Sequence, residues 1–187
     1  MDNLAKRDPI ANYSKIIKSN PLDYRAYNNR GNEYEKRGHH DLAIADYNSA
    51  IELRPDFILA YINRGNTYQK IGHYEQALGD YNKAIELNPG KDMAYNNRGF
   101  HYMLMKNYEQ AEQDIRKALE ISPNNIYALN SMAELFAAKN DSEEACRWLR
   151  KALEKGYNNW QYIKTSQTYN NIKSSECFRE IIAVTTE

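Results

Sequence analysis

Residues 60–89 read AYINRGNTYQKIGHYEQALGDYNKAIELNP, and this stretch recurs on both sides of itself. It aligns with residues 26–55 before it and with residues 94–123 after it, so position 60 corresponds to positions 26 and 94. A strictly constant period of this length is typical of an array of one supersecondary unit, in which stacked neighbours bury a continuous core. The prolines at the ends of the units keep the same interval: Pro21, Pro55, Pro89 and Pro123.

Each repeat predicts two helices joined by a turn. In residues 60–89, small and aromatic residues recur at helical spacing in two runs that Gly72 separates. Pro89 ends the second run, because the residue before a proline avoids the helical region. The sequence therefore predicts an all-α fold of antiparallel helix pairs. The expected packing positions are Tyr61, Gly65, Tyr68, Ala77, Tyr81 and Ala84.

The recurring residues resemble the signature of the tetratricopeptide repeat (TPR), a helical unit of about 34 residues. The second repeat matches the first at every signature position, the third has Ile115 in the place of an aromatic residue, and the fourth has Tyr157 where proline is usual. This resemblance implies a right-handed α-solenoid of antiparallel helix pairs, the TPR superhelix. The matching residues of the first repeat are Tyr27, Gly31, Tyr34, Ala43, Tyr47, Ala50 and Pro55.

On this interpretation residues 1–187 form a single TPR domain. A capping helix is expected from about Leu4 to Ser19, with a start or a kink at Pro9. The predicted segments are an N-terminal capping helix in residues 1–22, regular repeats at 23–55, 56–89 and 90–123, a degenerate repeat at 124–157 and a C-terminal cap at 158–187.

The segment after Tyr157 resembles the end-of-group segment that closes many bacterial TPR arrays. That segment has a short helix, a turn-rich acidic stretch and a last helix, although Ser166 and Gln167 replace the usual acidic residues here. The resemblance implies a cover for the exposed face of the fourth repeat, as a terminal repeat requires. The residues expected to form this cover are Trp160, Tyr162, Ile163, Ile172, Phe178 and Ile181.

An arginine and an aspartate recur together in the three regular repeats. Arg30 is followed at a fixed interval by Asp46, and the same pair recurs at positions 64 and 80 and at positions 98 and 114. In the fourth repeat both partners change together, to Met132 and Trp148. Since one unpaired buried charge costs several kcal/mol, this joint change predicts a partly buried ion pair between the two helices of each regular repeat.

Asparagines are expected to line the concave groove that the first helices of the repeats would form. Asn29, Asn63 and Asn97 recur with the period of the repeat and predict a ladder along it. A carboxamide offers both a donor and an acceptor, so it can pair with any peptide unit. The ladder resembles the one in the TPR arm of O-GlcNAc transferase, although asparagines that simply face water are the alternative. Asn32 and Asn66 are expected to face the same guest.

The groove is predicted to become apolar towards its C-terminal end. Phe100, Met103 and Tyr127 are expected to form an adaptable apolar pocket there, together with Met93 and Leu104. The alternative is that these residues pack on the C-terminal segment or on a second copy of the chain.

Composition argues against several other classes of function. The 25 basic and 25 acidic residues cancel, which disfavours a polyanionic partner such as nucleic acid or a membrane surface. No apolar run is long enough for a membrane span. The spacing of Cys146 and Cys177 suggests neither a disulfide framework nor a metal site, so a reducing, cytoplasmic location is expected. No set of residues suggests a catalytic centre, a metal or a cofactor.

A clamp for the C-terminal carboxylate of a chaperone is also disfavoured. In that TPR clamp, lysines and an arginine on successive first helices hold the carboxylate. The corresponding positions here carry Asn28, Met93 and Asn97, so the charge-assisted partner is missing. The sequence therefore argues against binding of Hsp70 or Hsp90 tails.

The predicted function is that of a non-catalytic adaptor or scaffold, which binds an extended peptide or a partner helix in its groove. One alternative is a self-association module that forms a homodimer. Another is an accessory that recruits substrates for a separate enzyme.

Overall fold

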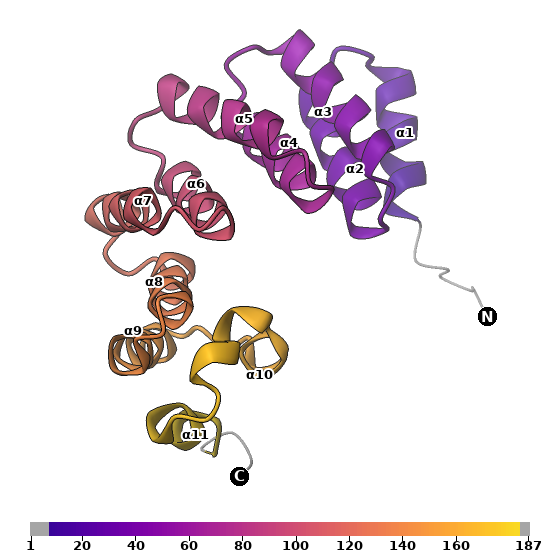
Figure 1. The fold of residues 1–187 in the computed structure, drawn as a ribbon. Helices are drawn as coiled ribbons and strands as arrows, with labels where there is room; N and C mark the ends of the chain where they lie inside the picture. The colour runs from indigo at the N-terminus through magenta and orange to yellow at the C-terminus, as the bar shows by residue number, and fades with distance from the viewer. Residues whose placement is uncertain (1–7, 184–187) are drawn as a thin grey trace, which may run out of the picture. The chain divides into compact units, whose positions relative to one another are not determined.

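The computed structural model describes residues 8–183, and every regular element within them is helical. The chain divides into two compact units, residues 1–89 and 90–187, and each is described by itself. The N-terminal unit contains α1 (Pro9–Ser19), α2 (Tyr24–Lys36), α3 (His40–Leu53), α4 (Ile58–Lys70) and α5 (Tyr74–Leu87) (Figure 1). The C-terminal unit contains α6 (Asp92–Leu104), α7 (Tyr108–Ile121), α8 (Ile126–Ala138), α9 (Ser142–Glu154), α10 (Trp160–Thr165), the 3₁₀-helix η1 (Gln167–Ile172) and α11 (Glu176–Ala183).

The helices pack in consecutive pairs, one pair for each predicted repeat. In the N-terminal unit α2 packs on α3 and α4 on α5; in the C-terminal unit α6 packs on α7 and α8 on α9. The predicted all-α class, a TPR solenoid of helix pairs, is confirmed. The single domain over residues 1–187 stays a prediction.

The N-terminal capping helix starts at Pro9, which was one of the two expected possibilities; the other was a kink at this residue. Asp8 caps this helix by accepting a hydrogen bond from the backbone N–H of Ile10, and Pro9 occupies the first turn, where its missing N–H is harmless. The expected stretch from Leu4 to residue 7 lies outside the described residues.

The turn inside each repeat needs a left-handed backbone. Gly38 and Gly72 supply it with φ angles of +77° and +82°. Lys106 and Asn140 stand one and two repeat periods beyond Gly72 and adopt the same conformation, with φ angles of 59° and 62°. A side chain in this region raises the free energy of the fold by about 1–2 kcal/mol, so the geometry of the turn persists where its glycine is lost.

A second glycine in each regular repeat allows the two helices to approach closely. A Cβ added to Gly65 would lie 2.9 Å from Cε1 of Tyr81, and one added to Gly99 would lie 2.7 Å from Cγ1 of Ile115. Tyr81 and Ile115 are fully buried against these positions. The glycine and the large residue that it accommodates therefore form one packing unit.

The predicted arginine–aspartate pairs are confirmed in all three regular repeats. A guanidinium nitrogen lies 2.7 Å from Asp46 in the first, 2.6 Å from Asp80 in the second and 2.7 Å from Asp114 in the third. In the fourth repeat Met132 is fully buried, and Trp148 packs against the same core. Each pair therefore joins the two helices of its own repeat.

Arg30 and Arg64 also reach the helix that precedes their own repeat. Arg30 donates through Nη1 to the hydroxyl of Ser14 on α1 at 3.1 Å, and Arg64 donates through Nη1 to Oδ1 of Asn48 on α3 at 2.5 Å. Ser14 and Asn48 are themselves one repeat period apart. The guanidinium therefore stabilises the stacking of neighbouring repeats as well as the repeat that carries it.

The C-terminal cap covers the fourth repeat as predicted. Ile163, Ile172, Phe178 and Ile181 are at most 5% exposed and belong to the core that contains α8 and α9. Trp160 is partly buried against the same core, and the hydroxyl of Tyr162 donates a hydrogen bond to Glu134 on α8. A solenoid has no further repeat to cover its last helix pair, so this segment replaces one.

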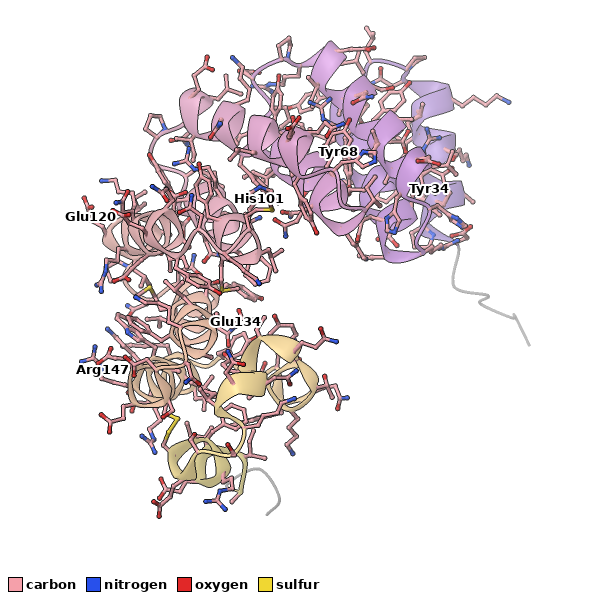
Figure 2. The ribbon with its side chains drawn as sticks, in the orientation of Figure 1. Tyr34, Tyr68, His101, Glu120, Glu134 and Arg147 are labelled. Atoms are coloured by element: carbon pink, nitrogen blue, oxygen red, sulfur yellow. A yellow bond between two sulfur atoms is a disulfide. The ribbon has the colours of Figure 1, made fainter. Side chains whose placement is uncertain are left out.

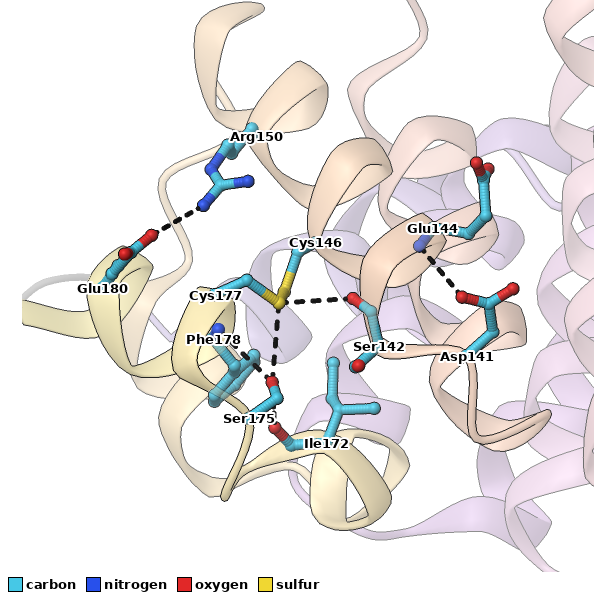
Figure 3. The surroundings of a disulfide bond; sticks show 10 residues. All are labelled: Asp141, Ser142, Glu144, Cys146, Arg150, Ile172, Ser175, Cys177, Phe178 and Glu180. Atoms are coloured by element: carbon cyan, nitrogen blue, oxygen red, sulfur yellow. Dashed lines mark hydrogen bonds and ion pairs between the residues drawn. A yellow bond between two sulfur atoms is a disulfide. The ribbon is translucent and has the colours of Figure 1, made fainter.

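The expectation for the cysteines was wrong: Cys146 on α9 and Cys177 on α11 form a disulfide bond (Figure 3). Their Cα atoms lie 6.1 Å apart, within the range that a disulfide can bridge. Spacing along the sequence gave no sign of this pairing, because the two residues meet only when α11 folds onto α9. No helix among residues 8–183 has the length and apolar character that crossing a bilayer requires.

Candidate functional site

Three of the four predicted asparagines of the N-terminal unit line a small polar pocket. Its volume is about 210 Å³, and it lies where α2, α3 and α4 meet. Three of the predicted site residues, Asn32, Asn63 and Asn66, line it. The other lining residues are Glu35, Lys36 and Tyr47.

Buried tyrosines fix how two of these asparagines are oriented. The hydroxyl of Tyr47 donates to Oδ1 of Asn32 at 2.8 Å, and the hydroxyl of Tyr81 donates to Oδ1 of Asn66 at 2.9 Å. Burial raises the pKa of both phenols, so they remain donors at neutral pH. Because the carboxamide oxygen of Asn32 already accepts a bond from Tyr47, Asn32 presents its Nδ2 group as a donor.

A chain of hydrogen bonds links the other asparagines across α2 and α4. Asn63 donates through Nδ2 to Oδ1 of Asn28 at 3.0 Å, and Asn28 donates through Nδ2 to Oδ1 of Asn29 at 3.3 Å. Within residues 8–183, this series of hydrogen bonds has the acceptor Oδ1 of Asn63 at one end and the donor Nδ2 of Asn29 at the other. The central residue, Asn28, is 4% exposed, so its buried side chain fixes the orientation of the more exposed Asn63 and Asn29.

Charged side chains connect the same two helices beside the pocket. Lys70 of α4 lies 2.7 Å from a carboxylate oxygen of Glu35 on α2. Both groups are partly exposed to solvent, so this pair contributes little stability. Its effect is to fix two long side chains at the edge of the asparagine pocket.

The remaining predicted site residues lie in the C-terminal unit and differ in exposure. Tyr127 is 66% exposed, and its ring contacts that of Tyr157 edge-on, with centroids 6.2 Å apart. Asn97 and Phe100 on α6 are half-buried, and Phe100 packs against the core of the unit. The expectation that Met103 is exposed was wrong: it is 4% exposed and is part of that core. Its side chain packs inside the C-terminal unit and is therefore not presented to a partner.

In the fourth repeat the groove positions are covered by the chain itself. Asn130, Ser131 and Glu134 of α8 are each at most 5% exposed. Glu134 stands where the first two repeats have Asn32 and Asn66. Figure 2 shows Glu134 on α8 facing the cap segment that contains α10 and η1.

Hydroxyl and amide groups surround the carboxylate of Glu134. Its Oε1 accepts hydrogen bonds from the hydroxyls of Tyr162 at 2.5 Å and Thr168 at 2.8 Å, and its Oε2 accepts one from Nδ2 of Asn130 at 2.9 Å. Tyr169 donates in turn to Oδ1 of Asn130 at 2.9 Å. Burial raises the pKa of Glu134 to about 7, although the three donated bonds oppose this rise.

This buried network could not be read from the repeats, because its donors belong to a segment that does not repeat. The only signal in the sequence was Glu134 itself, a carboxylate at a position where the preceding repeats have Asn32, Asn66 and Phe100. The cap therefore covers the face of α8 that corresponds to the predicted binding positions of the other first helices. Within residues 8–183, no group of three or more His, Cys, Asp and Glu residues is arranged to hold a metal ion.

Three models of the tetratricopeptide repeat match the sequence. One model, described as tetratricopeptide repeat, matches twice, at residues 58–91 and 93–125. A second model with the same description matches residues 12–45, and a third, described as TPR repeat, matches residues 31–72. No curated protein gave a sequence match.

Solved structures of TPR proteins are similar to this chain. A tetratricopeptide repeat protein from Parabacteroides merdae is 27% identical, with a TM-score of 0.73 over 95% of this chain and 72% of that one. MamA is 27% identical, with a TM-score of 0.64 over 78% and 85% of the two chains. The first TPR of Spaghetti (RPAP3), bound to the HSP90 peptide SRMEEVD, is 29% identical, with a TM-score of 0.58 over 62% and 92%. With its periodic helix pairs and these matches, the chain belongs to the tetratricopeptide repeat family.

Proposed function

We propose that this protein is a non-catalytic adaptor that binds an extended peptide on the asparagine face of its N-terminal unit. We define the asparagine face as Asn29, Asn32, Asn63 and Asn66 on α2 and α4. The observation that carries the proposal is the chain from Asn63 through Asn28 to Asn29, which ends in one acceptor and one donor. A peptide unit offers the complementary donor and acceptor whatever its side chain.

The orientation of Asn32 strengthens this proposal. Tyr47 occupies the carboxamide oxygen of Asn32, so the Nδ2 group is available to a carbonyl of the guest. An extended segment would offer such carbonyls at regular intervals. In the C-terminal unit, Asn97 stands at the corresponding position of α6, and Phe100 and the exposed Tyr127 would offer apolar contacts to the side chains of a guest bound there.

Similarity to a peptide-bound TPR domain supports a peptide as the class of guest. That relative binds an HSP90 peptide, but the cationic positions of the carboxylate clamp carry Asn28 and Met93 in this chain. Since Asn28 is also buried, it offers no substitute for the missing charge. We therefore propose a guest held by its main chain, and not by its terminal carboxylate.

The test compares wild type with the triple variant Asn29→Ala/Asn63→Ala/Asn97→Ala in affinity capture from native lysate. Overlapping peptides are then synthesised from the sequences of the captured proteins, and each peptide is titrated against wild type and the triple variant. We expect at least one peptide that binds wild type and loses about tenfold or more in affinity with the variant, since each lost hydrogen bond contributes about 0.5–1.5 kcal/mol.

The matched control is Asn158→Ala, which removes an exposed asparagine from the C-terminal unit. Circular dichroism establishes that both variants keep their helical content. Identical capture by wild type and the triple variant, or an equal loss with Asn158→Ala, would overturn the role of the asparagine face.

Self-association is the second candidate. The C-terminal unit exposes Met93, Leu104 and Tyr127 by 42%, 43% and 66%, and apolar groups of this kind can form a dimer interface. Light scattering of wild type and Tyr127→Ser decides between the two functions: a dimer that the substitution disrupts would favour self-association. A substrate-recruiting accessory differs from the adaptor only in the identity of its partner.

The cellular location that we propose is cytoplasmic, but the disulfide now provides the measurement that tests it. Disulfides persist mainly in oxidising compartments. Alkylation of rapidly quenched cells, followed by mass spectrometry of the peptides that contain Cys146 and Cys177, determines the state of the bond. A quantitatively oxidised pair would contradict a reducing location.

A further inference from the structure

A second pocket lies on the C-terminal cap, and the peptide surface does not use it. Its volume is about 360 Å³, within the range of about 300–1,000 Å³ that is typical of small-molecule sites. We call it the cap pocket. The residues that line it are Lys164, Lys173, Phe178, Arg179, Ile182 and Ala183.

The apolar part of the cap pocket comes from α11. Phe178 is 3% exposed and is part of the core, while Ile182 is half-buried and packs against that core. The hydroxyl of Ser175 accepts a hydrogen bond from the backbone N–H of Phe178 at 3.4 Å (Figure 3), and the disulfide joins α11 to α9 beside it. The apolar wall is therefore held on a fixed helix.

Three cations from different segments complete the lining. Lys164 lies on α10, Lys173 follows η1, and Arg179 lies on α11. No acidic residue lines the pocket, and no ion pair is formed by these three side chains within the described part of the chain. The neighbouring carboxylate, Glu180, is paired with Arg150 of α9 at 3.0 Å. Among residues 8–183, the pocket therefore carries a net positive charge that no acidic side chain neutralises.

This combination favours one kind of ligand. Three like charges around a concave apolar surface repel one another, and an anion placed between them removes that repulsion. A guanidinium can hold a carboxylate with two parallel hydrogen bonds, and lysines add charge-assisted bonds. A small inorganic anion would leave the half-buried side chain of Ile182 in contact with water, whereas an apolar group attached to the carboxylate would cover it.

We infer that the cap pocket binds a small amphipathic carboxylate, an apolar chain or ring that carries one carboxylate group. The carboxylate would lie among Lys164, Lys173 and Arg179, and the apolar part would contact Phe178 and Ile182. This site differs from the asparagine face in location and in chemistry, so it stands or falls independently of the proposed peptide binding.

The experiment titrates the full chain with decanoate, below the concentration at which it forms micelles, by isothermal calorimetry. Decanol and acetate serve as the two comparison ligands, since one lacks the charge and the other the apolar chain. We expect decanoate to bind at least about tenfold more tightly than either, because a hydrogen bond to a charged group is worth about 1.5–3 kcal/mol. The affinity should also fall as salt is added.

Two variants and one control locate the binding. Lys173→Gln/Arg179→Gln should weaken decanoate binding by about tenfold or more, and Ile182→Ala should weaken it by several-fold through the lost apolar contact. Lys155→Gln removes an exposed lysine that follows α9 outside the cap pocket and should leave binding unchanged. Equal binding of decanoate and decanol, or an unchanged affinity in the double variant, would overturn the inference.

Discussion

Arg64 holds the carboxylate of Asp80 with two hydrogen bonds, from Nε at 2.8 Å and from Nη2 at 2.6 Å, across the contact between α4 and α5. The two side chains are 19% and 7% exposed, so neither charge is well solvated. Such a bidentate pair gives geometric specificity as well as attraction. The fourth repeat, with Met132 and Trp148 at these positions, shows that an apolar pair can replace it.

Breaking this pair from one side should be much more harmful than replacing it. We expect Arg64→Met to lower the free energy of unfolding by about 3–5 kcal/mol, because it leaves Asp80 buried without a counter-ion. The double variant Arg64→Met/Asp80→Leu should recover most of that loss. Urea unfolding of wild type, both single variants and the double variant measures the coupling. If the losses simply add, the two side chains do not act as a pair.

The helix glycines should respond in opposite directions to the same substitution. A Cβ at Gly99 would lie 2.7 Å from Ile115 and 3.0 Å from the backbone oxygen of Ala111, so Gly99→Ala should destabilise the fold by about 1–3 kcal/mol. A Cβ at Gly79 on α5 would meet nothing within 4 Å, and Gly79→Ala should stabilise the fold by about 1 kcal/mol.

Thermal unfolding of the two glycine variants, followed by circular dichroism, tests both directions with one chemical change. A lower midpoint for Gly79→Ala, or an unchanged midpoint for Gly99→Ala, would contradict the packing described for these helices.

The disulfide should contribute measurably to the stability of the cap. Closing the 31-residue interval between Cys146 and Cys177 restricts the unfolded chain by about 3–4 kcal/mol. We expect Cys146→Ala/Cys177→Ala to unfold at lower denaturant concentration than oxidised wild type. Reductant should bring wild type close to the variant and leave the variant itself unchanged. A thiol assay that finds two free thiols in the purified, non-reduced protein would refute the bond directly.

Stability should fall as pH rises through the range in which Glu134 titrates. Burial raises the pKa of Glu134 from 4.5 to about 7, so the folded protein keeps a proton that the unfolded chain has lost. The unfolding free energy should therefore decrease between pH 4.5 and about 7, by roughly 3 kcal/mol in all, and change no further above that range. The phenols facing Glu134, those of Tyr157, Tyr162 and Tyr169, have raised pKa values and stay neutral throughout.

The variant Glu134→Gln isolates this effect. Its amide keeps an acceptor for Tyr162 and Thr168 but does not titrate, so its stability should be nearly independent of pH over the same range. Urea unfolding at several pH values gives the slope for both proteins. The same slope in wild type and variant would assign the pH dependence to other groups.

The regular part of the fold was predictable because each repeat confirms its neighbours. The positions of the helices, the close approach at Gly65 and the pairing of Arg64 with Asp80 all follow from residues that recur with the period of the repeat. The bond between Cys146 and Cys177 was missed, since only the fold of the unrepeated cap brings these residues together.

The candidate site was predictable only in the first two repeats. Asn32, Asn63 and Asn66 do meet at one pocket. Glu134 occupies an equivalent position in its repeat but is buried, because hydroxyl groups from a later segment cover it. Periodicity identifies equivalent positions on helices, but it carries no information about which of them another part of the chain will cover.

The cap makes the end of this array chemically different from its beginning. Glu134 and Asn130 accept hydrogen bonds from specific hydroxyls of the cap, and Cys146 is joined to it covalently. The fourth repeat and the cap are therefore complementary to each other and form one unit, residues 124–183. Further repeat units could be inserted ahead of Asn124, where the joining surfaces recur, but not between α9 and the cap. Evolution or engineering can therefore lengthen this chain by duplicating internal units, whereas growth beyond Glu154 would require a new partner for every bond that the cap now makes.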